Sequence, residues 1–490
     1  YCISLYLPRH RLSGKKWEDL RMATINSVLN SFLFWAAWII IPFIMEMVPA
    51  IGNIFILFRK HKRIKQKTKE SEEQNLGFYP EITLMIPVYN SAGTLEACIR
   101  SIYESDYPND RINVYLINNQ GKDNSFQVFC RCQSKYPELI MQWLNAEQGK
   151  SKALNMALFN SKGKYIINID SDGILERSAL KNLIAKFEAD PEIQVMTGAI
   201  LIEPRLIEEY PWVFPKLLRK TEFMEYAQAF LAGRNYASET NSVYTLSGAF
   251  SAFRKSAVLN SHMYNTDTIC EDTELTFQMR YNKKEKVQIC ENAIFFVDPI
   301  DDMNKLYTQR QRWQRGSLEV SSMFLKDKLK VNRMFSDPTV RTLVYDHTFA
   351  FPRMIWYLAL ICLLFMNYSM QMVLFSVAIL FLGYFVVGFF YFFSTVVFLK
   401  PFKELQKYYR KQWYVVFLLP FFNLLVFFIR FAGIINSINT SSAWKTRNFT
   451  EEKQAFKDEF LGNTSGIRGD IQKFRAFVNV QGMEDERQSD

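Results

Sequence analysis

The fold is predicted from nine residues, Tyr165–Gly173, with the sequence YIINIDSDG. The first five form a largely apolar run, typical of a parallel strand that is covered on both faces. The run stops at Asp170 and Asp172, which share a face because strand side chains alternate. In an open α/β sheet, ligands bind at the carboxyl ends of the strands. The two acids therefore predict a site for one divalent cation, and an acidic turn closed by Gly173 is the alternative.

Strand and helix patterns alternate around this stretch, with short connections. Such alternation predicts an α/β fold with a parallel, doubly wound sheet that has a nucleotide-binding layout. The chain contains neither Gly-x-Gly-x-x-Gly nor Gly-x-x-x-x-Gly-Lys-Ser, which argues against dinucleotide-binding and P-loop folds. The predicted strands are Glu81–Val88, Ile112–Ile117, Leu139–Leu144 and Lys164–Ile169, and the predicted helices are Thr94–Tyr103, Asp123–Tyr136 and Gly149–Phe159.

Polar residues follow the predicted strand ends and should meet in one crevice. Pro87 and Tyr89 lie at the end of the first strand, and Asn118 and Asn119 at the end of the second. The helix that begins with Gly-Lys-Ser-Lys carries Lys152, and its N-terminal amides and lysines suit a diphosphate. With the acids after the fourth strand, these residues supply a base pocket, a phosphate cradle and metal ligands. For the lysines, a solvated helix start is the alternative.

Two later segments carry further candidates. Ser247 and Gly248 belong to a small, apolar stretch, TLSGAF, as expected of a surface that lies against a ligand. Glu271 and Asp272 begin a predicted helix in the stretch CEDTE. These acids suit proton transfer, although acids in a first helical turn also complement the helix dipole without any further role.

A helical face is predicted at the motif QRQRW. Gln309, Arg312 and Trp313 are spaced i, i+3 and i+4, so they share that face. An indole stacks on a sugar ring and a guanidinium binds oxyanions in a fork, so the face suits a pyranose and a phosphate. An amphipathic helix lying on a membrane is the alternative, and the two are compatible.

Membrane insertion is predicted from the distribution of apolar residues. The chain has 490 residues, 49% of them hydrophobic, and a formal net charge of +10. A span needs about 20 apolar residues. Basic loops beside the spans predict a cytoplasmic central domain, so the net charge reflects topology and anionic lipid, not nucleic acid. Pro420 and Arg430 make the last span a possible re-entrant or interfacial element. The predicted spans are Phe32–Met45 with its flanks, Met354–Tyr368, Val373–Leu399 and Trp413–Ile435.

These features predict the following organisation of the chain. Because the sequence does not begin with Met, we expect residues 1–26 to be a cytoplasmic-flank or interfacial segment without its true start. A transmembrane segment, 27–58, and a basic linker, 59–79, precede the catalytic domain, 80–316. An amphipathic interface region, 317–351, transmembrane helices, 352–435, and a polar tail, 436–490, complete the chain.

Three of the motifs occur in a fixed order between the membrane segments, namely Asp170-x-Asp172, Glu271-Asp272 and Gln309-x-x-Arg312-Trp313. Together they resemble the processive branch of family 2 glycosyltransferases, which includes the cellulose, chitin, hyaluronan and poly-N-acetylglucosamine synthases. The resemblance covers about residues 81–316. It implies a GT-A fold, an inverting mechanism, a UDP-sugar donor and Mg²⁺ or Mn²⁺.

The resemblance also implies a role for each matching residue. Asp172, helped by Asp170, would hold the metal that bridges the diphosphate, and Lys152 would touch that diphosphate. Asp272 would be the general base for the acceptor hydroxyl. The donor would be bound by Pro87, Tyr89, Asn118, Asn119, Gln309 and Arg312, and the acceptor by Trp313, Glu271, Ser247 and Gly248.

Two departures from the family pattern stand out. Asn118-Asn119 replace the usual paired acids, one of which accepts a hydrogen bond from the uracil ring; an Asn can accept but also donate. Cys270 stands where the family more often has Thr. Similar Asn substitutions occur in a Gram-positive branch associated with exosortase, which the chain also resembles.

We therefore expect a bacterial, multi-pass plasma-membrane enzyme that elongates, and possibly exports, an extracellular polysaccharide. Its expected partners are a UDP-sugar, a growing glycan or lipid-linked acceptor, membrane lipid, and a small membrane subunit or a second copy, with no nucleic acid. One alternative is non-processive transfer of one sugar to a lipid carrier or glycolipid. Another is a non-catalytic scaffold, for which the Asn118-Asn119 change is the motive.

Overall fold

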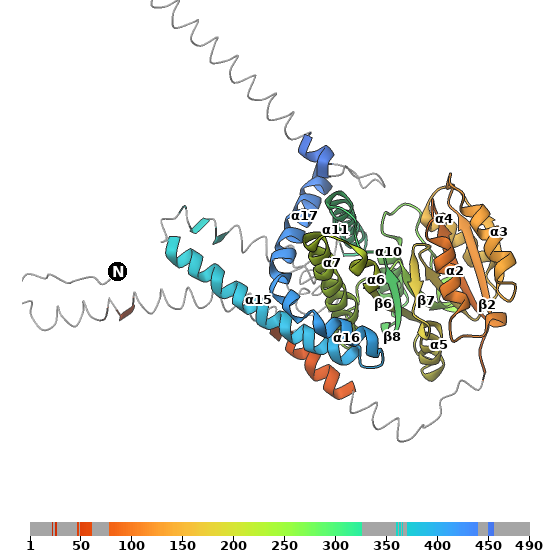
Figure 1. Cartoon of the computed structure of the whole chain (residues 1–490), viewed down its shortest axis with the longest axis horizontal. Helices are drawn as coiled ribbons and strands as arrows, with labels where there is room; N and C mark the ends of the chain where they lie inside the picture. The colour runs from red at the N-terminus through yellow and green to blue at the C-terminus, as the bar shows by residue number, and fades with distance from the viewer. Residues whose placement is uncertain are drawn as a thin grey trace, which may run out of the picture.

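The computed structural model describes the predicted catalytic domain and part of the apolar regions (Figure 1). The described residues are 22, 25–26, 47–48, 50–60, 78–325, 359–360, 362–363, 365, 370–439 and 449–454. The predicted span Phe32–Met45, most of Met354–Tyr368, residues 326–351 of the predicted interface region and residues 455–490 of the tail lie outside them.

Eight strands form one sheet, in the order β3-β2-β1-β4-β7-β6-β8-β5. The strands are β1 Ile82–Val88, β2 Ile112–Asn118, β3 Ile140–Asn145, β4 Tyr165–Ile169, β5 Gly173–Leu175, β6 Val195–Ile202, β7 Phe250–Arg254 and β8 Val287–Val297. The helices around the sheet are α2 Leu95–Tyr103, α3 Ser125–Lys135, α4 Lys150–Asn160, α5 Ala179–Ala189, α6 Pro204–Glu209, α7 Val213–Tyr226, α8 Arg234–Glu239, α9 Lys255–Leu259, α10 Glu271–Phe277 and α11 Met303–Leu325. Short 3₁₀ and π-helical elements are η1 Asn109–Arg111, η2 Ala227–Gly233 and η3 Gln278–Asn282.

The prediction of an α/β fold is confirmed, with one correction to the sheet. Strands β1 to β4 are parallel to one another, as predicted. Strand β7 then runs antiparallel to both β4 and β6, so the whole sheet is mixed, not parallel. The correction has a topological cause, because the chain leaves β6 for the helices α6 to α8 and returns beside β4 in the opposite direction.

The register of the parallel strands places their carboxyl ends together. Val88 at the end of β1 pairs with Asn118 at the end of β2, and Asn118 pairs with Asn145 at the end of β3. All five residues of β4 are buried, as its apolar sequence predicts. The segments that follow β1, β2 and β4 therefore emerge at one edge of the sheet.

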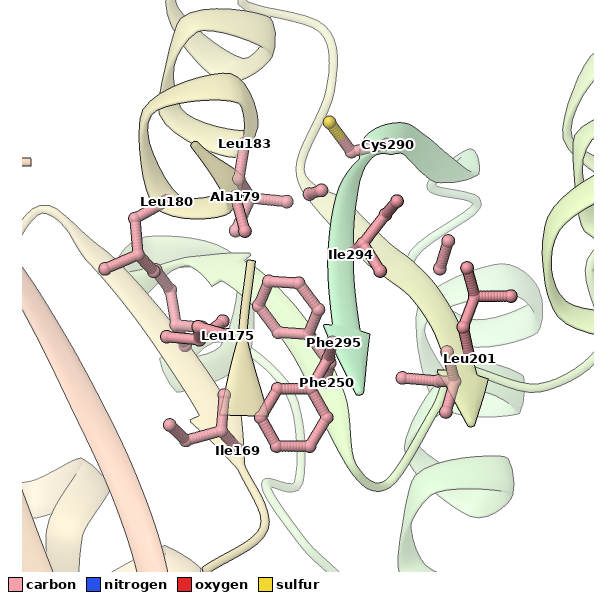
Figure 2. Packing of buried hydrophobic residues seen from close by; sticks show 14 of the residues in the cluster. Ile169, Leu175, Ala179, Leu180, Leu183, Leu201, Phe250, Cys290, Ile294 and Phe295 are labelled. Atoms are coloured by element: carbon pink, nitrogen blue, oxygen red, sulfur yellow. The ribbon is translucent and has the colours of Figure 1, made fainter. Parts of the chain in front are cut away.

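Close packing of aromatic rings on glycines shapes the core beside β4 (Figure 2). A Cβ on Gly173 would lie 2.2 Å from Phe295, and one on Gly198 would lie 2.1 Å from Phe250. Phe250 and Phe295 themselves pack with ring centroids 5.7 Å apart. Gly173, predicted as the close of a turn, is thus also required by the core, because a strand glycine lets a ring approach the backbone.

Two described helices, α15 Met370–Phe398 and α17 Leu419–Asn439, are long and apolar enough to cross a membrane. Their apolar windows have mean hydropathies of 2.5 and 1.7. The predicted span Val373–Leu399 matches α15. The predicted span Trp413–Ile435 is divided into the 3₁₀ helix η4 Trp413–Phe417 and α17, and Pro420 lies in the first turn of α17, where it does not break the helix.

Helix α17 lies beside α11 and α7 of the sheet domain, whereas α15 contacts η2 near Gly388 and extends away from the domain at its N-terminal end (Figure 1). Phe422 and Val426 of α17 pack with Leu306 and Tyr307 of α11 in one apolar cluster. The helix α16 Lys403–Lys411 lies between α15 and α17. It carries basic residues, as predicted for a loop beside a membrane span. Helix α11 runs through position 316, so the predicted boundary between domain and interface region falls inside a helix.

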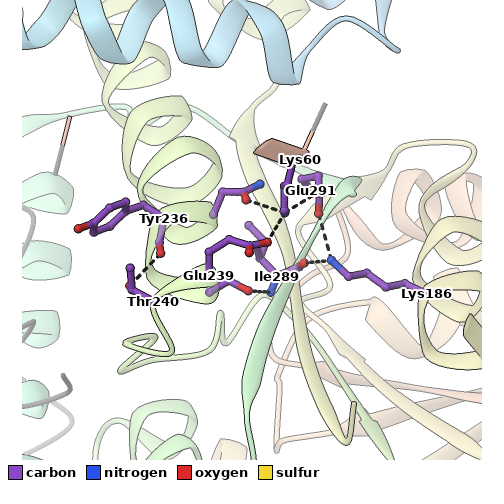
Figure 3. A network of polar contacts seen from close by, with 9 residues as sticks. Lys60, Lys186, Tyr236, Glu239, Thr240, Ile289 and Glu291 are labelled. Atoms are coloured by element: carbon purple, nitrogen blue, oxygen red, sulfur yellow. Dashed lines mark hydrogen bonds and ion pairs between the residues drawn. The ribbon is translucent and has the colours of Figure 1, made fainter. Parts of the chain in front are cut away.

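Residues 50–60 form a helix that contacts the sheet domain at the buried Ala50 and through ion pairs of its last residue (Figure 3). Lys60 Nζ lies 3.0 Å from Glu291 Oε1 and 3.3 Å from Glu239 Oε1, and Lys186 Nζ lies 3.1 Å from Glu291 Oε2. Glu291 sits at an irregularity of β8, where the pairing with β6 jumps from Cys290 to Ile294. Such a bulge re-aims a side chain away from the ladder. Lys60, predicted as part of a membrane-flanking basic loop, therefore makes an ion pair within the protein.

Candidate active site

The loops after β1 and β2 turn sharply at the edge where the strands end. Asn90 and Gln120 adopt φ values of 53° and 58°, a left-handed conformation that short polar residues tolerate best. Pro87 is half-buried in β1, and Tyr89 exposes half of its surface at the rim. These predicted donor-binding residues therefore border the strand ends.

The two asparagines after β2 hold the loops of this edge. The Asn118 amide accepts a hydrogen bond from Gly121 N at 3.0 Å and donates one to Asn145 Oδ1 at 3.1 Å. The Asn119 amide accepts from Gly149 N at 2.6 Å. Asn119 is buried and fixes the start of α4, whereas Asn118 remains partly accessible. Of the two, Asn118 is thus the one placed to meet a base.

The turn after β4 carries the two predicted metal ligands. It is anchored by Ser171, whose hydroxyl lies 2.7 Å from that of Ser91, and by Asp170 N, which donates to Ala249 O at 3.2 Å. Asp172 is exposed, although neighbouring atoms displace part of the water around its carboxyl group. Partial desolvation, followed by the charge of Asp170, raises its pKa to about 6. The acidic turn, one of the two interpretations made from the sequence, is confirmed, and the metal site stays a prediction.

Lys150, the first of the two lysines at the start of α4, has a central place in this site. Its Nζ lies 2.6 Å from Asp170 Oδ1, 3.1 Å from Gly248 O and 3.6 Å from Glu271 Oε1. Burial opposes the charge, but Asp170 and Glu271 raise the pKa of Lys150 above its ordinary value, so the amine is protonated. Lys150 therefore joins the turn after β4 to the start of α10.

Lys152, the lysine predicted to touch the diphosphate, points elsewhere. Its amine pairs with Glu147 at 2.7 Å on the surface. Residues two apart on a helix do not share a face, so Lys150 and Lys152 cannot both face the site. The available signal was Leu154, four residues after Lys150, because an apolar residue at that spacing marks the inward face.

Asp272 is oriented by backbone groups. Its Oδ2 accepts from Gly248 N at 2.9 Å, and its Oδ1 accepts from Thr273 N at 2.7 Å. Gly248 O in turn accepts from Lys150 and from Asn168 Nδ2, the latter at 2.8 Å. The predicted base and the predicted acceptor residue Gly248 are therefore in direct contact.

Glu271 and Ser247, which lie close to Asp272, are more deeply buried than Asp272. Glu271 is buried, and burial together with Asp272 raises its pKa. Ser247 N donates to Thr197 Oγ1 of β6 at 3.2 Å, which fixes the stretch TLSGAF on the sheet. Glu271 and Ser247 thus form a buried part of the site, and Ser247 fixes the backbone next to Gly248.

The motif QRQRW lies on α11, which packs on the start of α10. A Cβ on Gly316 would lie 1.9 Å from Cys270 Sγ, and Cys270 Sγ lies 3.8 Å from Arg312 O. Gln309, Arg312 and Trp313 are all half-buried. The contact at Cys270 brings the backbone of this motif next to the start of α10, where Glu271 and Asp272 lie.

Trp313 belongs to an aromatic cluster with η2. Its ring meets Phe230 edge-on, with centroids 5.9 Å apart, and the Arg310 guanidinium lies 4.5 Å from its centroid. Arg310 also forms a buried ion pair with Glu225 at 2.5 Å. The indole is therefore fixed by its neighbours, and Arg310, which the sequence analysis did not select, holds it.

The donor set at this edge fits a divalent cation that shares its ligands with a substrate. Among the described residues, no group of three His, Cys, Asp or Glu side chains could hold a metal alone. Asp170 and Asp172 supply carboxylate oxygens, the ligands that Mg²⁺ and Mn²⁺ prefer, and Mg²⁺ is usually bound by one or two carboxylates plus substrate phosphates. The residues present are compatible with that arrangement.

Comparison with known proteins gives a family match for the central domain. Residues 83–260 match the family model described as Glycosyl transferase family 2. The chain is 25% identical over 283 residues to a poly-beta-1,6-N-acetyl-D-glucosamine synthase of Staphylococcus aureus, a match that covers 57% of this chain and 64% of that protein. It is 24% identical over 295 residues to the synthase of the same name from Staphylococcus epidermidis, covering 60% and 66%.

Two of the matching solved structures have low sequence identity to this chain. One is the mannosyltransferase PcManGT from Pyrobaculum calidifontis in complex with GDP-Man and Mn²⁺, with a TM-score of 0.48 and 17% identity over 76% of this chain and 97% of that one. The other is S. aureus TarS 1-349, with a TM-score of 0.37 and 14% identity over 68% and 90%.

Proposed function

We propose that this chain, which carries a glycosyltransferase family 2 domain with a GT-A-like α/β fold, is a membrane-bound inverting enzyme that elongates a polysaccharide from a UDP-sugar. One observation carries the proposal. Lys150 and Gly248 link the acid after β4 to the acids at the start of α10, on which the Trp313 helix packs. This linkage supports a single site for a nucleotide, a proton transfer and a sugar ring.

Asp272 is the proposed general base. An inverting transfer needs a carboxylate that removes the proton of the acceptor hydroxyl as that oxygen attacks the anomeric carbon. The N–H groups of Gly248 and Thr273 hold the two oxygens of Asp272 and fix its direction.

The departing nucleotide is stabilised by positive charge. Lys150 lies within reach of a diphosphate at the start of α4, and Arg312 lies on the neighbouring α11. Bound to Asp170 and Asp172, a divalent cation would neutralise charge on the diphosphate. Asn118 is placed for the base, and Trp313, held by Phe230 and Arg310, for the acceptor sugar.

The membrane organisation belongs to the same proposal. Segments 27–58 and 352–435 would cross the plasma membrane several times and leave the domain on the cytoplasmic side. The apolar helices α15 and α17 support this organisation, because each is long enough to cross a bilayer. Residues 317–351 would lie along the membrane surface and 436–490 would form a polar tail.

The test is a product assay with the full chain in lipid nanodiscs. The names of the staphylococcal relatives make UDP-N-acetylglucosamine the first donor to try, beside UDP-glucose and GDP- and CDP-sugars. We expect metal-dependent UDP release and a radiolabelled product of many sugars. Product that extracts into organic solvent with one sugar added would support single transfer to a lipid acceptor instead. Absence of nucleotide release with every donor would favour the scaffold alternative.

A further inference from the structure

The amine of Lys150 sits where it neutralises a proposed metal ligand. An ammonium has three N–H donors. Two of them are used in the hydrogen bonds to Asp170 Oδ1 at 2.6 Å and Gly248 O at 3.1 Å, and the third faces Glu271 Oε1 at 3.6 Å. The side chain is only 20% exposed, so this arrangement is part of the folded site and not a surface ion pair.

A divalent cation at Asp170 would meet this ammonium at close range. Two positive charges within a few ångströms repel each other. The carboxylate that would attract the metal is also already partnered. Lys150 and a free metal ion therefore compete for the same oxygen, whereas a diphosphate brings negative charge that both cations can share.

We propose that Lys150 is a resident counter-ion that keeps metal affinity low in the free enzyme, so that the metal binds together with the nucleotide. The inference rests on the proposed function for its nucleotide, but its central claim concerns the metal alone. Binding of one ligand must then strengthen binding of the other by the same factor. Lys150 is thus a positioning residue that acts through Asp170, and it causes the metal to bind with the nucleotide and not before it.

The experiment measures Mn²⁺ binding to the full chain in detergent by electron paramagnetic resonance, with and without UDP. Wild-type protein should bind Mn²⁺ at least tenfold more tightly when UDP is saturating. Lys150→Met should bind Mn²⁺ alone at least tenfold more tightly than wild type, and UDP should then add little. Lys150→Arg, which keeps the charge, should stay within about threefold of wild type.

Lys152→Met is the matched control, because Lys152 has the same chemistry but pairs with Glu147 on the surface. It should leave Mn²⁺ affinity unchanged. The proposal is overturned if Lys150→Met binds Mn²⁺ as wild type does, or if Lys152→Met gains as much. It is also overturned if UDP leaves the Mn²⁺ affinity of the wild-type protein unchanged. This outcome needs no variant, so it tests the proposal even if Lys150→Met does not fold. A wild-type chain that binds UDP and Mn²⁺ as expected but transfers no sugar would contradict the proposed function and leave this inference standing.

Discussion

Asp272 is the single residue on which the proposed chemistry most depends. Replacing it with Asn keeps the size of the side chain and at least one of its two backbone hydrogen bonds, but removes the basic oxygen. We expect Asp272→Asn to lower kcat on the order of a hundredfold or more, with UDP affinity changed less than about threefold. Initial rates of UDP release, with UDP binding measured separately, check this.

The matched control for Asp272 is Asp267→Asn, because Asp267 is exposed in the loop before α10. That variant should keep wild-type turnover. Equal rates for wild type and Asp272→Asn would remove Asp272 from the role of base.

Glu222 of α7 is buried near Arg310 of α11, and burial makes its negative charge unfavourable for folding. Burial, opposed by Arg310, raises its pKa from 4.5 to about 7. Above pH 7 the folded protein therefore holds a buried charge that lowers its stability, and protonation relieves this cost as the pH falls through 7. The variant Glu222→Gln is neutral at every pH and should be more stable than wild type by about 1–3 kcal/mol at pH 8.

The stability difference at Glu222 should shrink between pH 8 and pH 6, as wild type becomes protonated. Thermal unfolding in detergent at both values measures it. The exposed Glu192→Gln is the control and should show no such pH dependence. A difference that grows toward pH 6 would mean that Glu222 is stabilised as a carboxylate.

At the scale of elements, the start of α10 and the motif helix α11 depend on a single glycine. A Cβ on Gly316 would overlap Cys270, with the sulfur at 1.9 Å and its Cβ at 2.6 Å. We expect Gly316→Ala to cost about 1–3 kcal/mol, since neither backbone can give way without moving its helix. It should also lower turnover, because Trp313 would shift relative to Asp272.

Unfolding temperature and turnover of Gly316→Ala test this contact. Gly93→Ala is the control, because a Cβ there meets nothing within 4 Å. Adding Cys270→Gly to Gly316→Ala removes both overlapping atoms and should restore most of the loss. A double variant as impaired as the single one would show that the overlap is not the cause.

Elements with local signals were predictable, and those set by long-range pairing were not. Strands β1 to β4 each show an apolar run with a polar end, so their positions and parallel order followed from the sequence. The direction of β7 depends on how helices α6 to α8 return the chain to β4, which no local pattern encodes.

The same distinction holds within the site. Asp170 and Asp272 were selected because acids at strand and helix ends stand out, and the structure links both through Gly248 and Lys150. The resemblance assigns the diphosphate to Lys152, but the polar start of α4 does not fix the helix phase, and Lys150 is the lysine that contacts Asp170. Arg310 was passed over because its partner, Glu225, lies on another helix.

At the scale of the whole molecule, the ion pairs of Lys60 join the helix of residues 50–60 to the sheet domain (Figure 3). Glu291 is the centre of this network, with Lys60 and Lys186 on its two oxygens. Burial opposes its charge, but Lys186 and Lys60 outweigh burial and lower the pKa of Glu291 from 4.5 to about 2. The stabilisation is therefore complete above about pH 4.5 and is lost as the pH falls toward 2.

Removing the carboxylate should loosen this junction at neutral pH. Glu291→Gln leaves two lysines without their shared partner, so we expect a loss of about 1–3 kcal/mol of stability and at least tenfold faster hydrogen exchange in residues 50–60. Lys60→Met should speed exchange in the same residues with a smaller loss of stability, because Lys186 still pairs with Glu291. Hydrogen exchange followed by mass spectrometry measures both, with Glu192→Gln as the exposed control. Unchanged exchange in residues 50–60 of Glu291→Gln would show that apolar contacts such as the buried Ala50 hold the helix, and that the ion pairs do not.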